Sequence, residues 1–148
     1  MDLQEKDLVI LGALKENAGL SLNALSKKTG IPPATLHYRL KMLYGEKIIK
    51  RQTIEIDYRK IGKQVEAFIL IEVANAASGG RDIPKIVALL KGIPGVEHVS
   101  VVTGSIDMVL HVRASSIEEL SELILKRVRL VPGVGRLNTL ISLAQKEE

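Results

Sequence analysis

Apolar residues recur at helical spacing in three stretches of the first 45 residues. An amphipathic helix is predicted over 3–17 from leucines that share one face, at positions Leu3, Leu8, Leu11 and Leu14. Ser21 is a good N-cap for a second helix over 22–29, which Gly30 would end. A third helix is predicted over about 33–45, where proline suits the first turn and leucines follow at i, i+4 and i+7, as Leu36, Leu40 and Leu43.

Strand-like and helix-like segments alternate from residue 63 onward. Strands are predicted where β-branched residues gather, over 65–74, 96–103, 106–113 and 134–144, the middle two joined by a tight turn at Gly104-Ser105. Helices are predicted over 82–91, with Asp82 as N-cap, and over 116–129, with acids in the first turn and bases in the last. The order β-α-β-β-α-β indicates a ferredoxin-like split βαβ arrangement.

An internal repeat supports this arrangement. Residues 93–96 (Ile-Pro-Gly-Val) return 38 positions later as residues 131–134 (Val-Pro-Gly-Val). Apolar positions in the preceding helices and following strands keep the same offset. Each copy is therefore interpreted as a helix, a Pro-Gly turn and a strand. The alternative is a chance match of a common helix-to-strand turn.

Both faces of the predicted sheet carry apolar residues. One face of the first strand presents Ala67, Ile69, Ile71 and Val73, and the opposite face presents Phe68 and Leu70; the third strand divides in the same way, into Ile106, Met108, Leu110 and Val112 against Val109. Helices of such a fold cover one face only, so the other face needs a cover. A second copy of the same sheet is the simplest cover, which predicts a homodimer.

The chain is thus predicted to be an α+β protein of two domains. Residues 1–62 would form a winged or helix-turn-helix three-helix domain with a linker strand, and residues 63–148 a ferredoxin-like βαββαβ domain. Residues 48–58 alternate after their first pair and are interpreted as a strand, or as a wing plus linker, with Ile54 and Ile56 facing the core. Gly62 would be the hinge.

Composition narrows the function classes. The chain is 46% hydrophobic and 26% charged and contains no cysteine, which excludes disulfides and thiolate metal sites. The three histidines form no ligand pair at metal-binding spacing, so neither a metal nor another cofactor is expected. No apolar run approaches the ~20 residues of a membrane helix, and the acidic N-terminus does not resemble a signal peptide. A cytoplasmic protein without a membrane partner is therefore expected.

The positive charge is concentrated near the N-terminus. Residues 1–62 hold 11 basic and 7 acidic side chains, while residues 63–148 hold 10 of each, so the first segment carries the whole net charge of +4. Residues 27–51 alone contain seven bases and one acid. This distribution favours a surface that binds a polyanion, joined to a neutral module. The alternative is an ordinary solvated face rich in lysine.

The two short helices over 22–29 and 33–45, joined by a short turn, are typical of a helix-turn-helix. The exposed face of the second helix would enter the major groove of double-stranded DNA, where Arg39 can pair with a guanine or a phosphate, alongside Thr35, His37, Tyr38 and Lys41. Phosphate contacts are expected from the surrounding bases, namely Lys27, Lys28, Lys41, Lys47, Lys50 and Arg51. A three-helix packing unit without nucleic-acid function is the alternative.

Three functions remain open on these patterns. The leading one is a sequence-specific DNA-binding regulator. The first alternative is a nonspecific architectural DNA-binding protein, separated from it by the ratio of specific to nonspecific affinity. The second is a small-molecule-binding or enzymatic ferredoxin-like domain. The chain contains no phosphate-binding glycine loop and no obvious nucleophile–base pair, so an enzyme is not expected.

Together these residues resemble the Lrp/AsnC (feast/famine) family of transcription regulators over nearly the whole chain. The resemblance rests on ordered short motifs: Asp7 to Leu11, Arg39-Leu40 to Ile48-Ile49, Asp57, Ile61-Gly62, the hairpin Val102 to Asp107 with its Thr-Gly-x-x-Asp pattern, the second Pro-Gly-Val and Thr139. Pro32, Tyr44, Lys47 and Ile106 depart from the residues common in the family at those places.

The resemblance implies dimers that pair through the C-terminal sheets and assemble further into octamers. It also implies an amino-acid effector, of unknown identity, bound beside the Thr-Gly-x-x-Asp hairpin. Backbone N–H groups near Gly104 and Ser105 would hold its carboxylate and Asp107 its ammonium or a polar side chain, with Thr103 and His98 lining the pocket. The alternative for Gly104 and Asp107 is a tight turn and its cap.

Overall fold

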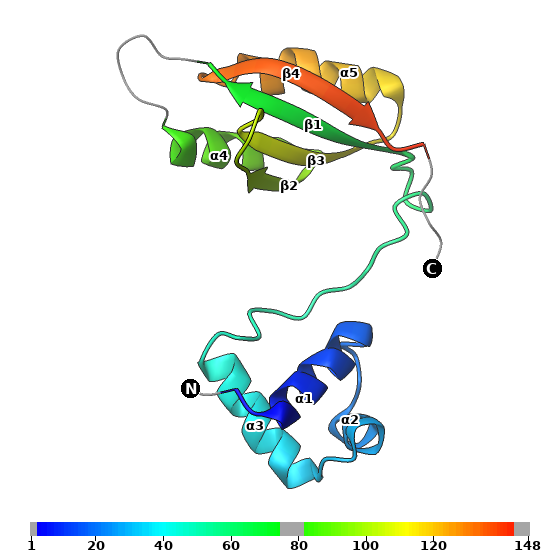
Figure 1. Ribbon diagram of the computed structural model, residues 1–148. Helices are drawn as coiled ribbons and strands as arrows, with labels where there is room; N and C mark the ends of the chain where they lie inside the picture. Colours follow the sequence, from blue (N-terminus) through cyan, green and yellow to red (C-terminus); the bar gives the residue numbers. More distant parts are fainter. Residues whose placement is uncertain (1–2, 75–81, 144–148) are drawn as a thin grey trace. The chain divides into compact units, whose positions relative to one another are not determined.

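The computed structural model describes residues 3–74 and 82–143 and divides the chain into two compact units, residues 1–56 and 57–148. We call them the N-terminal unit and the C-terminal unit (Figure 1). The division falls six residues before the expected boundary at residue 62. Contacts of Tyr58 with Glu97 and of Lys63 with Glu119 tie the end of the linker to the C-terminal unit.

The N-terminal unit is a bundle of three helices, α1 (Glu5–Glu16), α2 (Leu22–Thr29) and α3 (Pro33–Gly45). The Ser21 hydroxyl accepts a hydrogen bond from the N–H of Ala24 at 3.2 Å, so the predicted N-cap of α2 is confirmed. Gly30 ends α2 in the left-handed conformation. The core contains apolar side chains from all three helices and from the α2–α3 turn: Ile10, Ala13, Leu25, Ile31, Leu36 and Leu43.

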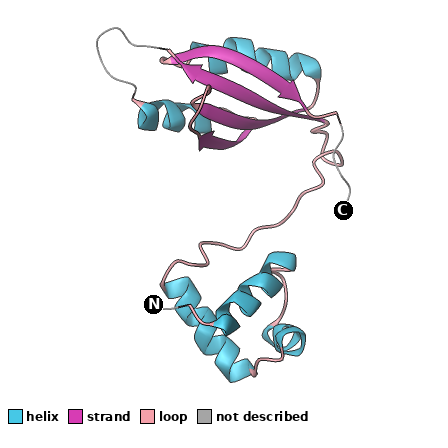
Figure 2. Cartoon of the chain, in the orientation of Figure 1, coloured by secondary structure: helices cyan, strands magenta, loops and turns pink. Residues whose placement is uncertain are grey.

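Two expectations for this unit were wrong. The buried face of α1 is formed by Asp7, Ile10 and Ala13, whereas Leu8 is 61% exposed. Because α1 is apolar nearly all the way round, its hydrophobic pattern did not specify which face would be buried. Residues 48–58 contain no strand and Ile54 is 79% exposed, because this segment has no partner strand within the N-terminal unit (Figure 2).

The C-terminal unit is an antiparallel sheet of four strands with the order β2-β3-β1-β4. Its elements follow the predicted ferredoxin-like order, as β1 (Val65–Val73), α4 (Ile83–Lys91), β2 (Val96–Val101), β3 (Met108–Ala114), α5 (Ile117–Lys126) and β4 (Val134–Ile141). The predicted Asp82 N-cap is confirmed, since its carboxylate accepts from the N–H of Lys85 at 3.1 Å. The predicted second helix stops at Lys126, and a short 3₁₀ turn, η1 (Val128–Leu130), follows it.

Both helices of this unit cover the same sheet face. Ile86 and Leu90 of α4 and Leu120 and Leu123 of α5 join one apolar cluster with the inward residues of the strands, including Ala67, Ile69, Ile71, Met108, Leu110 and Val112. The predicted division of β1 and β3 into two faces is therefore confirmed, and the helices show which face is the core. Ile106, expected on the third strand, lies before β3, which begins at Met108.

The internal repeat also has a structural counterpart. Gly95 and Gly133 occupy equivalent positions and have φ of 92° and 93°. A Cβ at Gly133 would lie 2.6 Å from Cδ1 of Ile86 in α4, and one at Gly95 would lie 2.8 Å from Cδ1 of Leu123 in α5. Each turn thus packs against the helix of the other copy, which makes the two halves structurally reciprocal.

The sheet face opposite the helices is less apolar than expected. Phe68 is 38% exposed there and stacks on the His111 ring, with 5.0 Å between ring centroids. Beside them, the Glu66 carboxylate lies 2.6 Å from Nε2 of His111 and 2.8 Å from Nη2 of Arg113. We call Glu66, His111 and Arg113 the sheet-face charge cluster.

Candidate DNA-binding surface and effector hairpin

The outer face of α3 presents a polar surface on a firmly packed helix. Leu36 and Leu43 are fully buried and anchor α3 in the core, while His37 and Lys41 are exposed one turn apart. Tyr38 is 58% exposed, although large aromatic side chains usually find a partner. No acidic residue occurs within α3, so its outer face carries no charge that would repel a polyanion.

Arg39 was expected on the outer face of α3, but its guanidinium is bound to Asp7 of α1. Its Nε donates to Oδ1 of Asp7 at 2.6 Å and its Nη2 donates to Oδ2, so the guanidinium is engaged by a carboxylate of α1. The Arg39 side chain is only 11% exposed and the Asp7 side chain 0%. The hydrogen bonds from Arg39 hold the pKa of Asp7 below its ordinary value, and the same bonds raise the pKa of Arg39. The guanidinium is therefore committed within the N-terminal unit, in contrast to the expected contact with DNA.

Sequence reasoning overlooked this pair, although the chain contained a signal for it. Asp7 is an acid three residues before Ile10, on what proves to be the apolar side of α1. A carboxylate at such a position needs a cationic or hydrogen-bonding partner. Arg39 is the matching base on a helix that packs against α1.

The remaining predicted phosphate contacts are exposed bases, and they lie at two places along the N-terminal unit. Lys27 and Lys28 close the last turn of α2, where Lys28 pairs with Glu16 of α1. Lys47, Lys50 and Arg51 follow the C-terminal end of α3. Lys50 and Arg51 line a groove between the end of α1 and the extended segment 48–55. Thr35 is half-buried within the first turn of α3.

The β2–β3 hairpin exposes Thr103, Gly104 and Ser105, and Gly104 has a φ of 132° that favours glycine. Asp107 is half-buried, and its Oδ2 accepts a hydrogen bond from the N–H of Val73 at 2.7 Å. Its own N–H donates to the carbonyl of Ile71 at 2.9 Å. The Asp107 carboxylate thus secures the hairpin to the end of β1, a contact between strands rather than a cap within the turn.

His98 is not brought to the tip of the hairpin. It pairs in register with His111 of β3, three residues from the end of β2, or roughly 10 Å along the strand. Its neighbour across the ladder is therefore a member of the sheet-face charge cluster. Among the expected effector residues, the structure gathers Thr103, Gly104, Ser105 and Asp107 in one turn.

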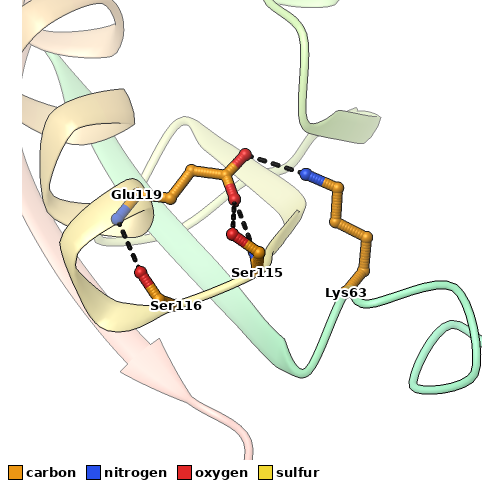
Figure 3. Close-up of polar contacts among 4 residues, drawn as sticks. All are labelled: Lys63, Ser115, Ser116 and Glu119. Atoms are coloured by element: carbon orange, nitrogen blue, oxygen red, sulfur yellow. Dashed lines mark hydrogen bonds and ion pairs between the residues drawn. The ribbon is translucent and has the colours of Figure 1, made fainter.

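Two polar clusters that were not predicted fix the end of the linker. The Glu119 carboxylate accepts hydrogen bonds from Nζ of Lys63 at 2.8 Å, from the N–H of Ser115 at 2.5 Å and from the Ser115 hydroxyl, while Ser116 caps α5 (Figure 3). These hydrogen bonds, first of all that from Lys63, lower the pKa of Glu119 to about 2. The pattern Ser116-x-x-Glu119 signals a helix start, but the contact with Lys63 spans 56 positions.

The second cluster involves the sheet face. The Arg113 guanidinium lies 4.0 Å from the centre of the Tyr58 ring, and the Tyr58 hydroxyl donates to Glu97 at 3.1 Å. The hydrogen bond with Glu97 raises the pKa of Tyr58. Two side chains of the segment before β1 are thus bound to the C-terminal unit.

The described residues contain neither a metal site nor a membrane-spanning helix. Within 3–74 and 82–143, no three histidine, aspartate or glutamate side chains gather as a metal site. Over the described chain, every helix is too short or too polar to cross a membrane.

An exposed polar helix in a three-helix unit, followed by a ferredoxin-like unit with a glycine hairpin, defines a helix-turn-helix protein with a separate C-terminal domain. Residues 3–50 match the winged helix-turn-helix DNA-binding domain, and residues 66–148 match the Lrp/AsnC ligand-binding domain. The chain belongs to the Lrp/AsnC family of transcriptional regulators. The resemblance to this family is therefore confirmed. The family consists of regulators rather than enzymes, which also confirms the expectation that the chain is not an enzyme.

Individual relatives are similar to this protein over nearly the whole chain, in sequence or in structure. An uncharacterised HTH-type transcriptional regulator of Pyrococcus furiosus is 37% identical over 146 residues, which cover 99% of this chain and 96% of that protein. The structure of Escherichia coli AsnC is similar with a TM-score of 0.82 and 25% identity, covering 100% and 97% of the two chains. The complex of the Neisseria meningitidis regulator NMB0573 with L-methionine gives a TM-score of 0.89 at 22% identity, covering 99% and 94%. The α+β fold predicted from the sequence is therefore confirmed.

Proposed function

We propose that this regulator reads specific DNA sequences with the outer face of α3 and adjusts that binding to a small effector. The observation that carries the proposal is the acid-free outer face of α3, where His37, Tyr38 and Lys41 project from a helix anchored by buried leucines. A helix of this kind fits the major groove, where side chains reach the edges of the bases.

The proposed contacts fall into two groups. Base edges would be read by His37, Tyr38 and Lys41, with Thr35 at the start of the helix. Phosphates would be held by the exposed bases around α3, namely Lys27, Lys28, Lys47, Lys50 and Arg51. Arg39 is removed from the first group because Asp7 engages its guanidinium.

Selection from a library of random DNA duplexes tests the proposal. The full-length protein should recover a defined sequence and bind it about 1,000-fold more tightly than a scrambled duplex at one fixed salt concentration. Equal binding of both duplexes would contradict sequence-specific reading and identify an architectural DNA-binding protein. Absence of binding to any duplex would contradict DNA binding altogether.

Variants separate the two groups of contacts. Tyr38→Ala should lower the affinity for the selected duplex by about tenfold or more and leave the scrambled duplex nearly unaffected. Lys27→Ala should weaken both complexes alike and reduce the salt dependence by about one counterion. Lys126→Ala, at an exposed position of α5 in the C-terminal unit, is the matched control and should change neither complex.

We further propose that the sheet face opposite the helices pairs with that of a second copy to form a homodimer. Phe68 and Leu140, 38% and 50% exposed, supply apolar area around the sheet-face charge cluster. Light scattering at micromolar concentration should give the mass of a dimer or of a larger even assembly, up to the octamer that the family resemblance implies. Phe68→Asp should give a monomer, and an unchanged mass would contradict this interface.

The effector is proposed to be an amino acid bound at the exposed hairpin of Thr103, Gly104 and Ser105. The support is the match of residues 66–148 to a ligand-binding domain and the backbone N–H groups that such a turn presents to a carboxylate. L-methionine is the first ligand to test, followed by the other amino acids, by calorimetry and by its effect on duplex affinity. The proposed location is the cytoplasm.

A further inference from the structure

A buried ion pair joins α1 to α3. Asp7 is fully buried, and its carboxylate lies on the core side of α1 with Ile10 and Ala13. Oδ2 accepts from the N–H of Gln4 at 2.8 Å, and both oxygens accept from the guanidinium of Arg39. The carboxylate is thus held by its own helix on one side and by α3 on the other.

We expect the unit to keep its stability when apolar residues replace both members of this pair. Removing two charges from water costs several kcal/mol per ion, and apolar residues of similar volume commonly replace such pairs without loss. The core that contains α1 and α3 is built from leucine, isoleucine and alanine side chains, and such apolar contacts are non-directional. A bidentate guanidinium–carboxylate pair is directional, because both parallel hydrogen bonds weaken when the two groups turn.

Arg39 lies in the same helix as the residues proposed to read DNA, so the orientation of its guanidinium affects theirs. Tyr38 precedes Arg39 and Lys41 lies two residues further, both exposed on the outer face. Because the residues share one rigid helix, a rotation that Arg39 prevents would displace Tyr38 and Lys41 from the base edges. Hydrogen bonds to bases need an accuracy of a few tenths of an ångström.

We infer that Asp7 and Arg39 are positioning residues for DNA recognition, which set the orientation of α3 without touching DNA. The inference rests on the proposed reading of DNA by α3. It differs from the sequence expectation, in which Arg39 itself contacts a base or a phosphate. The two roles predict opposite effects of Asp7: a positioning carboxylate is required for specificity, whereas a carboxylate that merely occupies a DNA-reading arginine restrains it.

The experiment compares affinities for the duplex selected by the wild-type protein and for its scrambled counterpart at one salt concentration. The variants are Asp7→Asn, which keeps the shape and removes the charge; Arg39→Lys, which keeps the charge and removes the planar fork; and the double change Asp7→Leu with Arg39→Met, which replaces the pair by apolar groups. Glu16→Gln is the control, since it breaks the exposed pair with Lys28 that joins α1 to α2.

The expected result is a loss of specificity with retention of the fold. All three variants should lower the ratio of specific to nonspecific affinity by at least about tenfold, and the control should leave it unchanged. Binding of the scrambled duplex should stay the same. The double variant should melt near the wild-type temperature, so its loss of specificity would not follow from unfolding.

Two results would overturn the inference. A folded double variant with the wild-type specificity ratio would show that orientation does not depend on the pair. Tighter binding by Asp7→Asn together with weaker binding by Arg39→Lys would show that Arg39 contacts DNA directly. If either single variant unfolds, the double variant still decides whether the orientation of α3 depends on the pair. Failure of the proposed function is distinct, because the wild-type protein would then select no sequence.

Discussion

Replacement of Glu119 by glutamine tests how the segment before β1 is held to the C-terminal unit. The Glu119 carboxylate binds Nζ of Lys63, 56 positions earlier, and the backbone and hydroxyl of Ser115. Glutamine keeps a carbonyl oxygen that accepts from Ser115 and removes the charge that attracts Lys63. The variant therefore isolates the electrostatic part of the contact.

The lowered pKa of Glu119 gives the size of its contribution to stability and the direction in which that contribution changes with pH. A fall from the ordinary value of 4.5 to about 2 would correspond to ~3.4 kcal/mol if it were felt in full. The Glu119 and Lys63 side chains are 42% and 36% exposed, so solvent screening reduces the expected contribution to about 1 kcal/mol. Because the folded pKa is depressed, this stabilisation is present above pH 4.5 and is lost as the pH falls through about 2.

Urea unfolding of the wild-type protein and of Glu119→Gln, followed by the amide signals of β3, measures the difference in the C-terminal unit. The variant should be about 1 kcal/mol less stable at pH 7, and the difference should shrink steadily below pH 4.5. Glu122→Gln is the matched control on the same helix, since it disrupts only an exposed pair with Lys126. A difference that is absent at pH 7, or equally large at pH 3, would refute the reasoning.

Three further predictions concern packing and the hairpin. Leu36→Ala, at a fully buried position of α3, should destabilise the N-terminal unit by about 3 kcal/mol in thermal unfolding, and a loss under 1 kcal/mol would argue against that packing. Gly133→Ala should lower the free energy of unfolding by about 2 kcal/mol, because φ is 93° and the new Cβ meets Ile86. Gly12→Ala lies at an open position within a helix and should stabilise the protein slightly in the same assay. Asp107→Ala should cost about 1 kcal/mol through the lost hydrogen bond at the end of β1 and abolish any effector response, while dimer mass and bare DNA affinity stay unchanged. Calorimetry and light scattering check these outcomes, and an intact response would exclude Asp107 from the effector site.

Elements with strong local signals were predicted closely. Ser21 and Asp82 cap helices because short polar side chains accept from the first free N–H groups. The alternation in β1 and β3 assigned the core face because a strand has a side-chain period of two and one face was fully apolar at both strands. The repeat of residues 93–96 and 131–134 anticipated two equivalent turns.

Two predictions failed where the local pattern did not determine what the segment packs against. Residues 48–58 have the composition of a strand, but a strand needs a neighbouring edge, and the N-terminal unit offers none. The face of α1 was misassigned because Val9, Ile10 and Ala13 extend the apolar surface well beyond the face that the leucines share. The strand predicted over 134–144 ends earlier, at Ile141, and residue 144 lies outside the described residues.

The candidate sites divide in the same way. The exposed residues His37, Tyr38 and Lys41 followed from helical spacing alone, since the buried leucines define the opposite face. Arg39 shows the limit of that reasoning, because its pairing with Asp7 across 32 positions depends on how α1 and α3 pack. Asp107 was identified from a local motif, yet its hydrogen bond to Val73 depends on strand pairing.

The sequence by itself determined the order of the helices, the order and core faces of the central strands, the basic N-terminal third and the family. These properties depend on side-chain period, capping and composition, which act between residues near in the chain. Only the tertiary structure decided which charged side chains meet: Asp7 with Arg39, Lys63 with Glu119, and Glu66 with His111 and Arg113. A buried or half-buried charge takes the nearest opposite charge in space, and that neighbour is set by the packing of whole elements rather than by the residues beside it.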